Sequence, residues 1–191
     1  MTGAATIDAI QAEADTRRWL ERAVIGLNLC PFAKAVHVKA QIHYAVYLLA
    51  DHGALIDALL KQADELAAFD ASVRDTTLLI APNTLADFLD FNDFTARAER
   101  KLARAGFDGV FQLASFHPQF QFAGTESGDI TNATNRAPYP TLHLLREDSV
   151  GRAVEAFPEA EAIFERNIDT LEALGPDGWA ALGVGTGSAR S

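Results

Sequence analysis

The chain has few of the residues on which secreted and membrane proteins depend. Its single cysteine cannot form an internal disulfide, and disulfides are typical of oxidising compartments. Its apolar runs all fall short of the roughly 20 residues that cross a bilayer. The first residues also lack the basic and apolar regions of a signal peptide. We therefore expect a cytoplasmic protein with no membrane partner.

Basic residues are scarce as well. The chain has 16 lysines and arginines against 26 aspartates and glutamates, which gives a formal net charge of -10. Because such a surface repels the phosphates of nucleic acids, we expect no nucleic-acid partner.

The common cofactor motifs are missing too. The position three residues after Cys30 is Ala33, so the chain has no Cys-x-x-Cys redox pair. It contains neither the Gly-x-Gly-x-x-Gly pattern nor a P-loop. The sequence therefore identifies no cofactor, and it leaves the oligomeric state open.

What the sequence does contain is a regular alternation of helical and extended patterns. Apolar spacing predicts helices over residues 7–28, 54–68, 84–105, 148–157 and 159–174. It predicts strands over residues 41–50, 76–81, 109–116 and 141–146. Asn83 or Thr84 can cap the third helix, and Gly106 suits the position after its end.

This order predicts a sheet covered by helices. The strands 109–116 and 141–146 follow one another without a helix, which favours an antiparallel pair. We therefore predict an α/β (α+β) fold, a two-layer sandwich with a mixed four-stranded sheet and helices packed on it. A doubly wound three-layer α/β fold is the alternative. One core suffices for this length, so we predict a single domain over residues 1–191, with frayed tails at 1–6 and 183–191.

The segment 115–147 has the composition of a functional site. It carries two of the five histidines, and a long polar loop separates its two strands. Loops of this length in a compact domain are usually functional or disordered, and the aromatic residues around this one argue against disorder.

The two histidines of this segment differ in their surroundings. If residues 116–122 are extended, His117, Gln119 and Gln121 share one face and the phenylalanines share the other. His143 falls within an apolar strand, on the face of Leu145. A lone histidine in a strand is more often a satisfied core residue than a catalyst, so both interpretations stay open.

Cys30 also has two interpretations. Cysteine is commonly buried, which favours a structural role. A thiolate could be stabilised by Lys34 nearby, whereas the C-terminus of the preceding helix would oppose ionisation. The thiol interpretation requires the Cys30 sulfur to lie within hydrogen-bond reach of His117 or His143, directly or through one water.

Three functions use these residues. The first is an enzyme of the class of cysteine-dependent hydrolases or transferases, in which Cys30 attacks and His117 or His143 accepts the proton. Asp129 or Asn132 would orient the imidazole. The second is a metal-dependent enzyme with His117, His143 and either Asp129 or Glu126 as ligands. The third is a module without catalysis that binds a ligand or partner through the same loop.

The loop itself suggests what is bound. Arg136 is a natural bidentate partner for a carboxylate or phosphate. That anion could belong to a ligand, or it could be Glu126 or Asp129 in a loop whose polar residues only stabilise its turns. Asn132, Asn135 and Tyr139 lie close to it in the sequence and complete a predicted polar clamp, with Lys34 as a further candidate. The predicted partner is a small anionic molecule or a peptide.

Three motifs together resemble a known family. They are Asn28-Leu29-Cys30-Pro31-Phe32-Ala33, Phe116-His117-Pro118-x-Phe120, and the run from Asn132 through Arg136 and Pro138-Tyr139-Pro140 to Arg146. In this order they resemble the bacterial family called domain of unknown function 1415, over roughly residues 15–175. The resemblance implies a single-domain bacterial protein and makes the motif residues preferred site candidates. It supplies no activity.

Overall fold

The computed structural model describes residues 7–157, 159 and 162–187. Within them, four strands form one sheet in the order β1-β2-β4-β3. The strands are β1 (Ile42–Val46), β2 (Thr76–Ile80), β3 (Phe111–Phe116) and β4 (Thr141–Arg146). The pair β1/β2 is parallel, whereas β2/β4 and β3/β4 are antiparallel. The predicted mixed four-stranded sheet is therefore confirmed, and so is the antiparallel pair on either side of the long loop.

The α-helices are α1 (Ala9–Trp19), α2 (Ala33–Val38), α3 (His52–Ala68), α4 (Phe88–Leu102), α5 (Glu147–Ala156) and α6 (Ile163–Ala181). Two π-helical segments continue α1 and α4, namely η1 (Leu20–Ile25) and η2 (Ala103–Phe107). The 3-10 helix η3 (Ile130–Asn135) lies in the β3–β4 loop. No helix in the described part of the chain is long and apolar enough to span a membrane.

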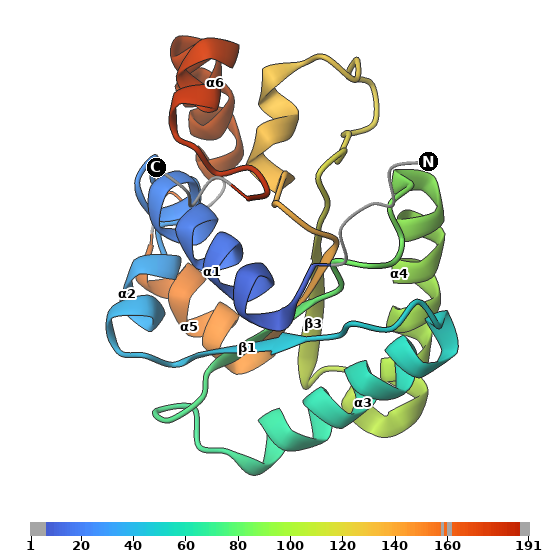
Figure 1. Cartoon of the computed structure of the whole chain (residues 1–191). Helices are drawn as coiled ribbons and strands as arrows, with labels where there is room; N and C mark the ends of the chain where they lie inside the picture. The colour runs from blue at the N-terminus through green and yellow to red at the C-terminus, as the bar shows by residue number, and fades with distance from the viewer. Residues whose placement is uncertain (1–6, 158, 160–161, 188–191) are drawn as a thin grey trace, which may run out of the picture.

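The helices pack on both faces of the sheet (Figure 1). On one face, α3 and α4 cover the odd-numbered Leu79 of β2 and the even-numbered Leu142 and Leu144 of β4. On the other, α1 and η1 cover Tyr44 of β1 and the even-numbered Leu78 and Ile80 of β2. Alternate residues of a strand point to opposite faces. Apolar side chains at consecutive positions of β2 therefore pack into the cores on both sides of the sheet.

The element boundaries differ from the prediction where a local signal outweighs periodicity. The helix predicted from residue 84 begins at Phe88, because the side chain of Asp87 accepts from the backbone N–H groups of Leu89 and Asp90 and caps it there. Leu85 instead has a positive φ of 55°. The last helix continues to Ala181 across a kink at Gly175, where the prediction ended it at residue 174.

The region around α6 supports the long loop. α6 packs against η3, and both lie beyond the same end of the sheet (Figure 1). Leu171 of α6, Ala133 of η3 and Leu29 form a small apolar cluster, and the Asn167 side chain donates to the Leu29 carbonyl oxygen over 2.9 Å. The loop is therefore braced from outside the sheet.

Candidate functional site

A pocket of about 450 Å³ lies between the start of α4 and the β3–β4 loop. Its lining residues share a mixed polar and apolar character, and they are Asp87, Phe88, Leu89, Pro118, Gln119, Gln121, Ser127 and Arg136. Five residues of the sequence-predicted loop therefore line a cavity together with the start of α4, and a concave site of this kind can hold a ligand. Of the predicted site residues, Arg136 is the one that lines it.

Arg136 is the only cation among these lining residues. Its Nε donates to the Phe120 carbonyl oxygen over 3.1 Å, and Nη2 donates to the Ser127 carbonyl oxygen over 2.7 Å. Nη1 makes no hydrogen bond to any described residue. Burial lowers the pKa of the Arg136 guanidinium, and the charge of Asp129 opposes that shift. Two neutral carbonyl groups therefore hold this half-buried cation in place.

Asp129 does not form an ion pair with Arg136 among the described residues. Its carboxylate accepts from the backbone N–H and the hydroxyl of Thr131, at 2.9 and 2.8 Å. These two bonds keep the pKa of Asp129 below its usual value. Asp129 thus caps η3, and it acts on Arg136 through its charge without forming an ion pair.

Asn132 organises the loop that carries Arg136. The side chain is completely buried. Its Oδ1 accepts from the Phe122 N–H and the Thr125 hydroxyl, and its Nδ2 donates to the Glu126 carbonyl oxygen. One amide thereby joins three points of the loop to η3, so Asn132 holds the loop together without lining the pocket.

Asn135 fixes the place where β3 ends. Its carbonyl oxygen accepts from the His117 N–H over 3.2 Å, and its side chain donates to the Ser115 carbonyl oxygen over 3.4 Å. Asn135 therefore pairs with β3 in the way that another strand would, and it does not line the pocket.

His117 turns away from the pocket. The chain turns at Pro118 and Gln119, with the Phe120 N–H donating to the His117 carbonyl oxygen, so the predicted extended run over 116–122 does not form. The imidazole is completely buried against Phe88 and Phe91. Only the two glutamines of the predicted polar face line the cavity.

Both ring nitrogens of His117 are bonded to the backbone. Nδ1 accepts from the Gln119 N–H over 3.0 Å, so Nε2 carries the proton and donates to the Leu85 carbonyl oxygen over 2.9 Å. Burial lowers the pKa of His117, although the bond to Leu85 opposes this. The geometry is that of a neutral histidine with a structural role.

His143 lies on the opposite face of the sheet from Leu142 and Leu144, as predicted. Its Nε2 is 2.6 Å from the Thr76 hydroxyl, which itself donates to the Leu144 carbonyl oxygen. Because that hydroxyl has one hydrogen, Nε2 is the donor to Thr76. Burial lowers the pKa of His143 to about 4, so the ring is neutral at physiological pH.

Cys30 packs half-buried against the core under α1, between η1 and α2. Burial raises the pKa of its thiol, and hydrogen bonds from the backbone of Phe32 and Ala33 only partly offset this. No hydrogen bond in the described part of the chain joins Cys30 to either histidine. Lys34 lies exposed on α2. The catalytic role of Cys30 stays a prediction that this geometry does not favour.

The residues of the metal alternative are likewise separated. Glu126 is exposed on the loop, while His117 and His143 have the separate surroundings described above. Among the described residues, no three His, Cys, Asp or Glu side chains are close enough to hold a metal ion.

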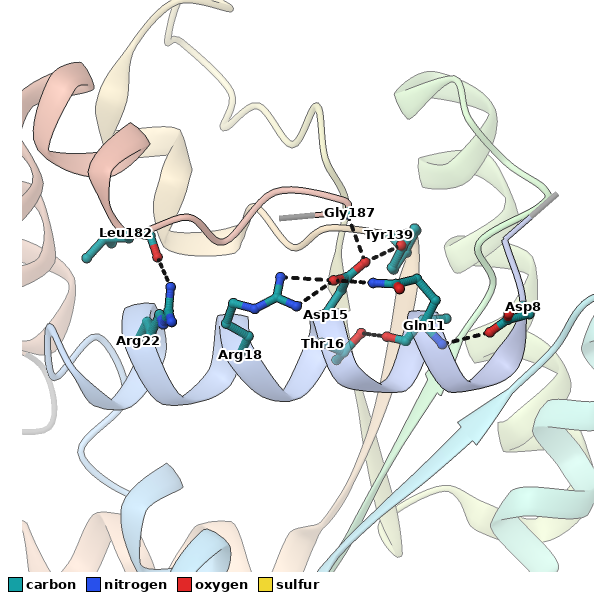
Figure 2. A network of polar contacts seen from close by, with 10 residues as sticks. Asp8, Gln11, Asp15, Thr16, Arg18, Arg22, Tyr139, Leu182 and Gly187 are labelled. Carbon is teal, nitrogen blue, oxygen red and sulfur yellow. Dashed lines mark hydrogen bonds and ion pairs between the residues drawn. The ribbon is translucent and has the colours of Figure 1, made fainter. Parts of the chain in front are cut away.

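Tyr139 belongs to a second polar cluster that the sequence did not reveal. Its hydroxyl donates to Oδ2 of Asp15 over 2.6 Å, and the Gly187 N–H donates to the same oxygen (Figure 2). Oδ1 accepts from the Gln11 amide and from both terminal nitrogens of Arg18. Spacings of four and three residues place these side chains on one face of α1, which was the available signal.

The Asp15 cluster is saturated with donors. Burial raises the pKa of Asp15, but the hydrogen bonds from Tyr139, Gly187, Gln11 and Arg18 outweigh it and leave the pKa below its usual value. Burial and the neighbouring Asp15 charge raise the pKa of Tyr139. Since every lone pair of the Asp15 carboxylate has a protein donor, the carboxylate joins three segments of the chain and has no lone pair left for a ligand.

The fold is a mixed α/β architecture with a pocket bounded by the β3–β4 loop and the start of α4. A family model described as a protein of unknown function, DUF1415, matches residues 11–181. The chain therefore belongs to the DUF1415 family, as its three motifs suggested. No curated protein and no solved structure matches it significantly.

Proposed function

We propose that this protein binds a small anionic molecule in the pocket beside Arg136. The observation that carries the proposal is the half-buried guanidinium, which two backbone carbonyl groups hold in place and which forms no ion pair with a described carboxylate. The charge of Asp129 acts on it only from a distance, and a half-buried cation without a directly bonded counter-ion is unfavourable. An anion bound to Nη1 would supply the missing charge with a directional hydrogen bond.

The pocket also limits the charge of the ligand. Asp87 lines it, and the side chain of this residue already accepts from Leu89 and Asp90 at the start of α4. A polyanion would be repelled by that carboxylate, whereas a single carboxylate can lie against Arg136. We therefore expect a small monocarboxylate with hydrogen-bonding substituents for Gln119, Gln121 and Ser127.

No catalytic step is part of this proposal. Both ring nitrogens of His117 are hydrogen-bonded to backbone groups. The raised pKa of Cys30 keeps its thiol protonated near neutral pH. Of the three functions that the sequence allows, the geometry supports ligand binding best.

Isothermal titration calorimetry with a panel of small carboxylic acids, together with inorganic phosphate and citrate, tests the proposal. We expect saturable binding of at least one monocarboxylate and weaker binding of citrate. The variant Arg136→Gln should bind about tenfold more weakly or worse, a loss of roughly 1.4 kcal/mol. Arg136→Lys should recover part of the affinity, because it restores the charge without the planar fork.

Two further variants separate binding from folding. The Gln119 side chain makes no hydrogen bond to any described residue, so Gln119→Ala should weaken binding without lowering stability. Arg152→Gln, an exposed change on α5, is the matched charge control and should bind normally. Equal affinity of Arg136→Gln and the unaltered protein, or no binding by any member of the panel, would contradict the proposal.

A further inference from the structure

The outer edge of β3 is open in the middle of the strand. β3 is the last strand of the sheet and pairs only with β4. The Glu147 N–H donates to the Val110 carbonyl oxygen. This bond shows which alternate residues of β3 direct their backbone N–H and C=O groups towards β4. Backbone groups at even positions of β3 therefore point to β4, and those of Phe111, Leu113 and Ser115 point outward.

The chain closes one end of this edge itself. Asn135 occupies the Ser115 carbonyl oxygen and the His117 N–H, as described above. In contrast, the outward backbone groups of Phe111 and Leu113 make no hydrogen bond to any described residue. Among the described residues, the outer edge of β3 is thus unpaired from Phe111 to Leu113 and is closed by Asn135 from Ser115 onwards.

A groove of about 380 Å³ runs beside that unpaired stretch. Strand residues from Phe111 to Ala114 form one side of it, and the end of α4 and η2 form the other. Its floor is apolar, since Leu102 and Phe111 are both buried there. Free backbone groups beside an apolar groove are the features by which a sheet edge accepts an extended peptide.

Charge selects among the possible occupants. Glu99, Asp108 and Glu147 line the groove, and no lysine or arginine is among the described lining residues. Two copies of this chain paired through β3 would bring six carboxylates together, which opposes self-association at this edge. A segment with lysine or arginine side chains would find these carboxylates unneutralised.

We propose that the outer edge of β3 binds an extended, basic peptide segment, which adds to the sheet as a fifth strand. The Phe111 and Leu113 backbone groups would hold the segment, the apolar floor would take its apolar side chains, and the three carboxylates would contact its basic ones. The groove at this edge shares no lining residue with the pocket beside Arg136. The peptide-binding proposal is therefore independent of the proposal that the pocket binds an anion.

Fluorescence anisotropy with labelled short peptides of alternating lysine and valine tests this. The lysine peptide should bind, and a peptide of alternating glutamate and valine should bind about tenfold more weakly or not at all. A lysine peptide with N-methyl groups on alternate residues keeps its charge but cannot donate to the edge. It should also lose about tenfold in affinity.

Variants of the protein locate the site. Leu113→Pro removes one outward N–H without removing a ladder bond to β4, a position where proline is tolerated in an edge strand. It should weaken binding of the lysine peptide. Should it fold poorly, the double variant Glu99→Gln, Asp108→Asn gives the same test, with Asp93→Asn, an exposed change on α4, as its control.

Three results would overturn the proposal. They are no binding of the lysine peptide at concentrations near 1 mM, equal binding of the N-methylated peptide, and unchanged binding by the double variant. A dimer in sedimentation that peptide does not dissociate, and that Leu113→Pro abolishes, would assign the edge to a second copy of the chain instead.

Discussion

Individual residues of the β3–β4 region divide into those that hold the loop and those that face its pocket. His117 and Asn132 are completely buried and bonded to backbone groups on several sides. Gln119 and Arg136, only a few positions away in the sequence, line the cavity. A polar residue in this loop therefore has a structural or a binding role according to the direction of its side chain.

Replacing His117 tests the structural role. His117→Ala removes a buried ring and leaves the Leu85 carbonyl and the Gln119 N–H without partners. We expect a loss of about 2–4 kcal/mol in the free energy of unfolding, measured by urea denaturation. His37→Ala, which alters a histidine outside both cores, is the control and should change stability by less than about 0.5 kcal/mol. An equally stable His117→Ala would refute the structural role.

His143 makes stability depend on pH. Its pKa is lowered to about 4 in the folded protein and is about 6.5 when unfolded, so between these values the unfolded chain binds more protons. The contribution of His143 is therefore fully present above about pH 6.5 and is lost as the pH falls towards 4. It amounts to roughly 3 kcal/mol, and the lowered pKa of His117 acts in the same direction.

The comparison of urea midpoints across this pH range checks the prediction. His143→Gln should flatten the decline of stability between pH 6.5 and 4, because the variant lacks the titrating group. A decline as steep as that of the unaltered protein would show that other groups cause the pH dependence.

The sequence alone predicted the direction of one of these two histidine side chains correctly. Alternation along the strand correctly assigned His143 to the face opposite Leu142 and Leu144, because a regular strand leaves no freedom in side-chain direction. The same reasoning was wrong for His117. The turn at Pro118 and Gln119 reverses the chain immediately after it, and extended geometry cannot be assumed across a turn.

At the scale of elements, the β3–β4 loop behaves as a small folded unit. η3 is capped by Asp129, braced by α6 and connected to the rest of the loop by Asn132. The unit holds Arg136 over the pocket by bonds to two loop carbonyl groups. The position of the cation therefore depends on the integrity of the loop.

Asn132→Ala should loosen this unit. The change leaves the Phe122 N–H and the Glu126 carbonyl unpaired, at a cost of about 2–3 kcal/mol. We expect faster proteolysis between Gly124 and Gly128, followed by mass spectrometry of the fragments. Asn92→Ala on the exposed side of α4 should be cleaved at the rate of the unaltered protein. An unchanged rate of cleavage in Asn132→Ala would show that Asn132 does not hold the loop together.

The sequence predicted most elements but missed the short ones. The strand 141–146 was predicted with its observed bounds, and the helix 54–68 begins two residues earlier as α3. The helix α2 and the 3-10 helix η3 were missed, since each spans only six residues and gives too little periodicity to detect. The order of the strands in the sheet could not be read from the chain, because it depends on contacts distant in sequence.

At the scale of the whole molecule, the Asp15 cluster joins the beginning of the described chain to its end. It connects α1 to Tyr139 before β4 and to Gly187 (Figure 2). Residues 1–6 and 188–191 of the predicted tails lie outside the described residues. Residues 183–187 differ from a frayed tail, since Val184 is buried and Gly187 is bonded to Asp15.

Asp15→Asn should release this connection. The amide removes the charge that faces Arg18 and places N–H groups against the donors of Tyr139 or Gly187, at a cost of about 2–4 kcal/mol. Hydrogen exchange at the Gly187 amide should become faster. Tyr139→Phe removes one bond and should cost about 1 kcal/mol, and Asp93→Asn is the matched control. A slow Gly187 amide in Asp15→Asn would argue against the connection.

Binding of an anion to Arg136 should change the NMR signals of its guanidinium group, because the anion would contact that group itself. The measurement is a nitrogen-15 NMR titration of arginine side chains with the carboxylate that binds in calorimetry, with Arg136→Lys to assign the signal. We expect the Arg136 resonance to shift saturably, with the calorimetric dissociation constant, while the resonances of Arg18 and Arg152 stay fixed. An unchanged Arg136 resonance at saturating ligand would contradict anion binding at this residue.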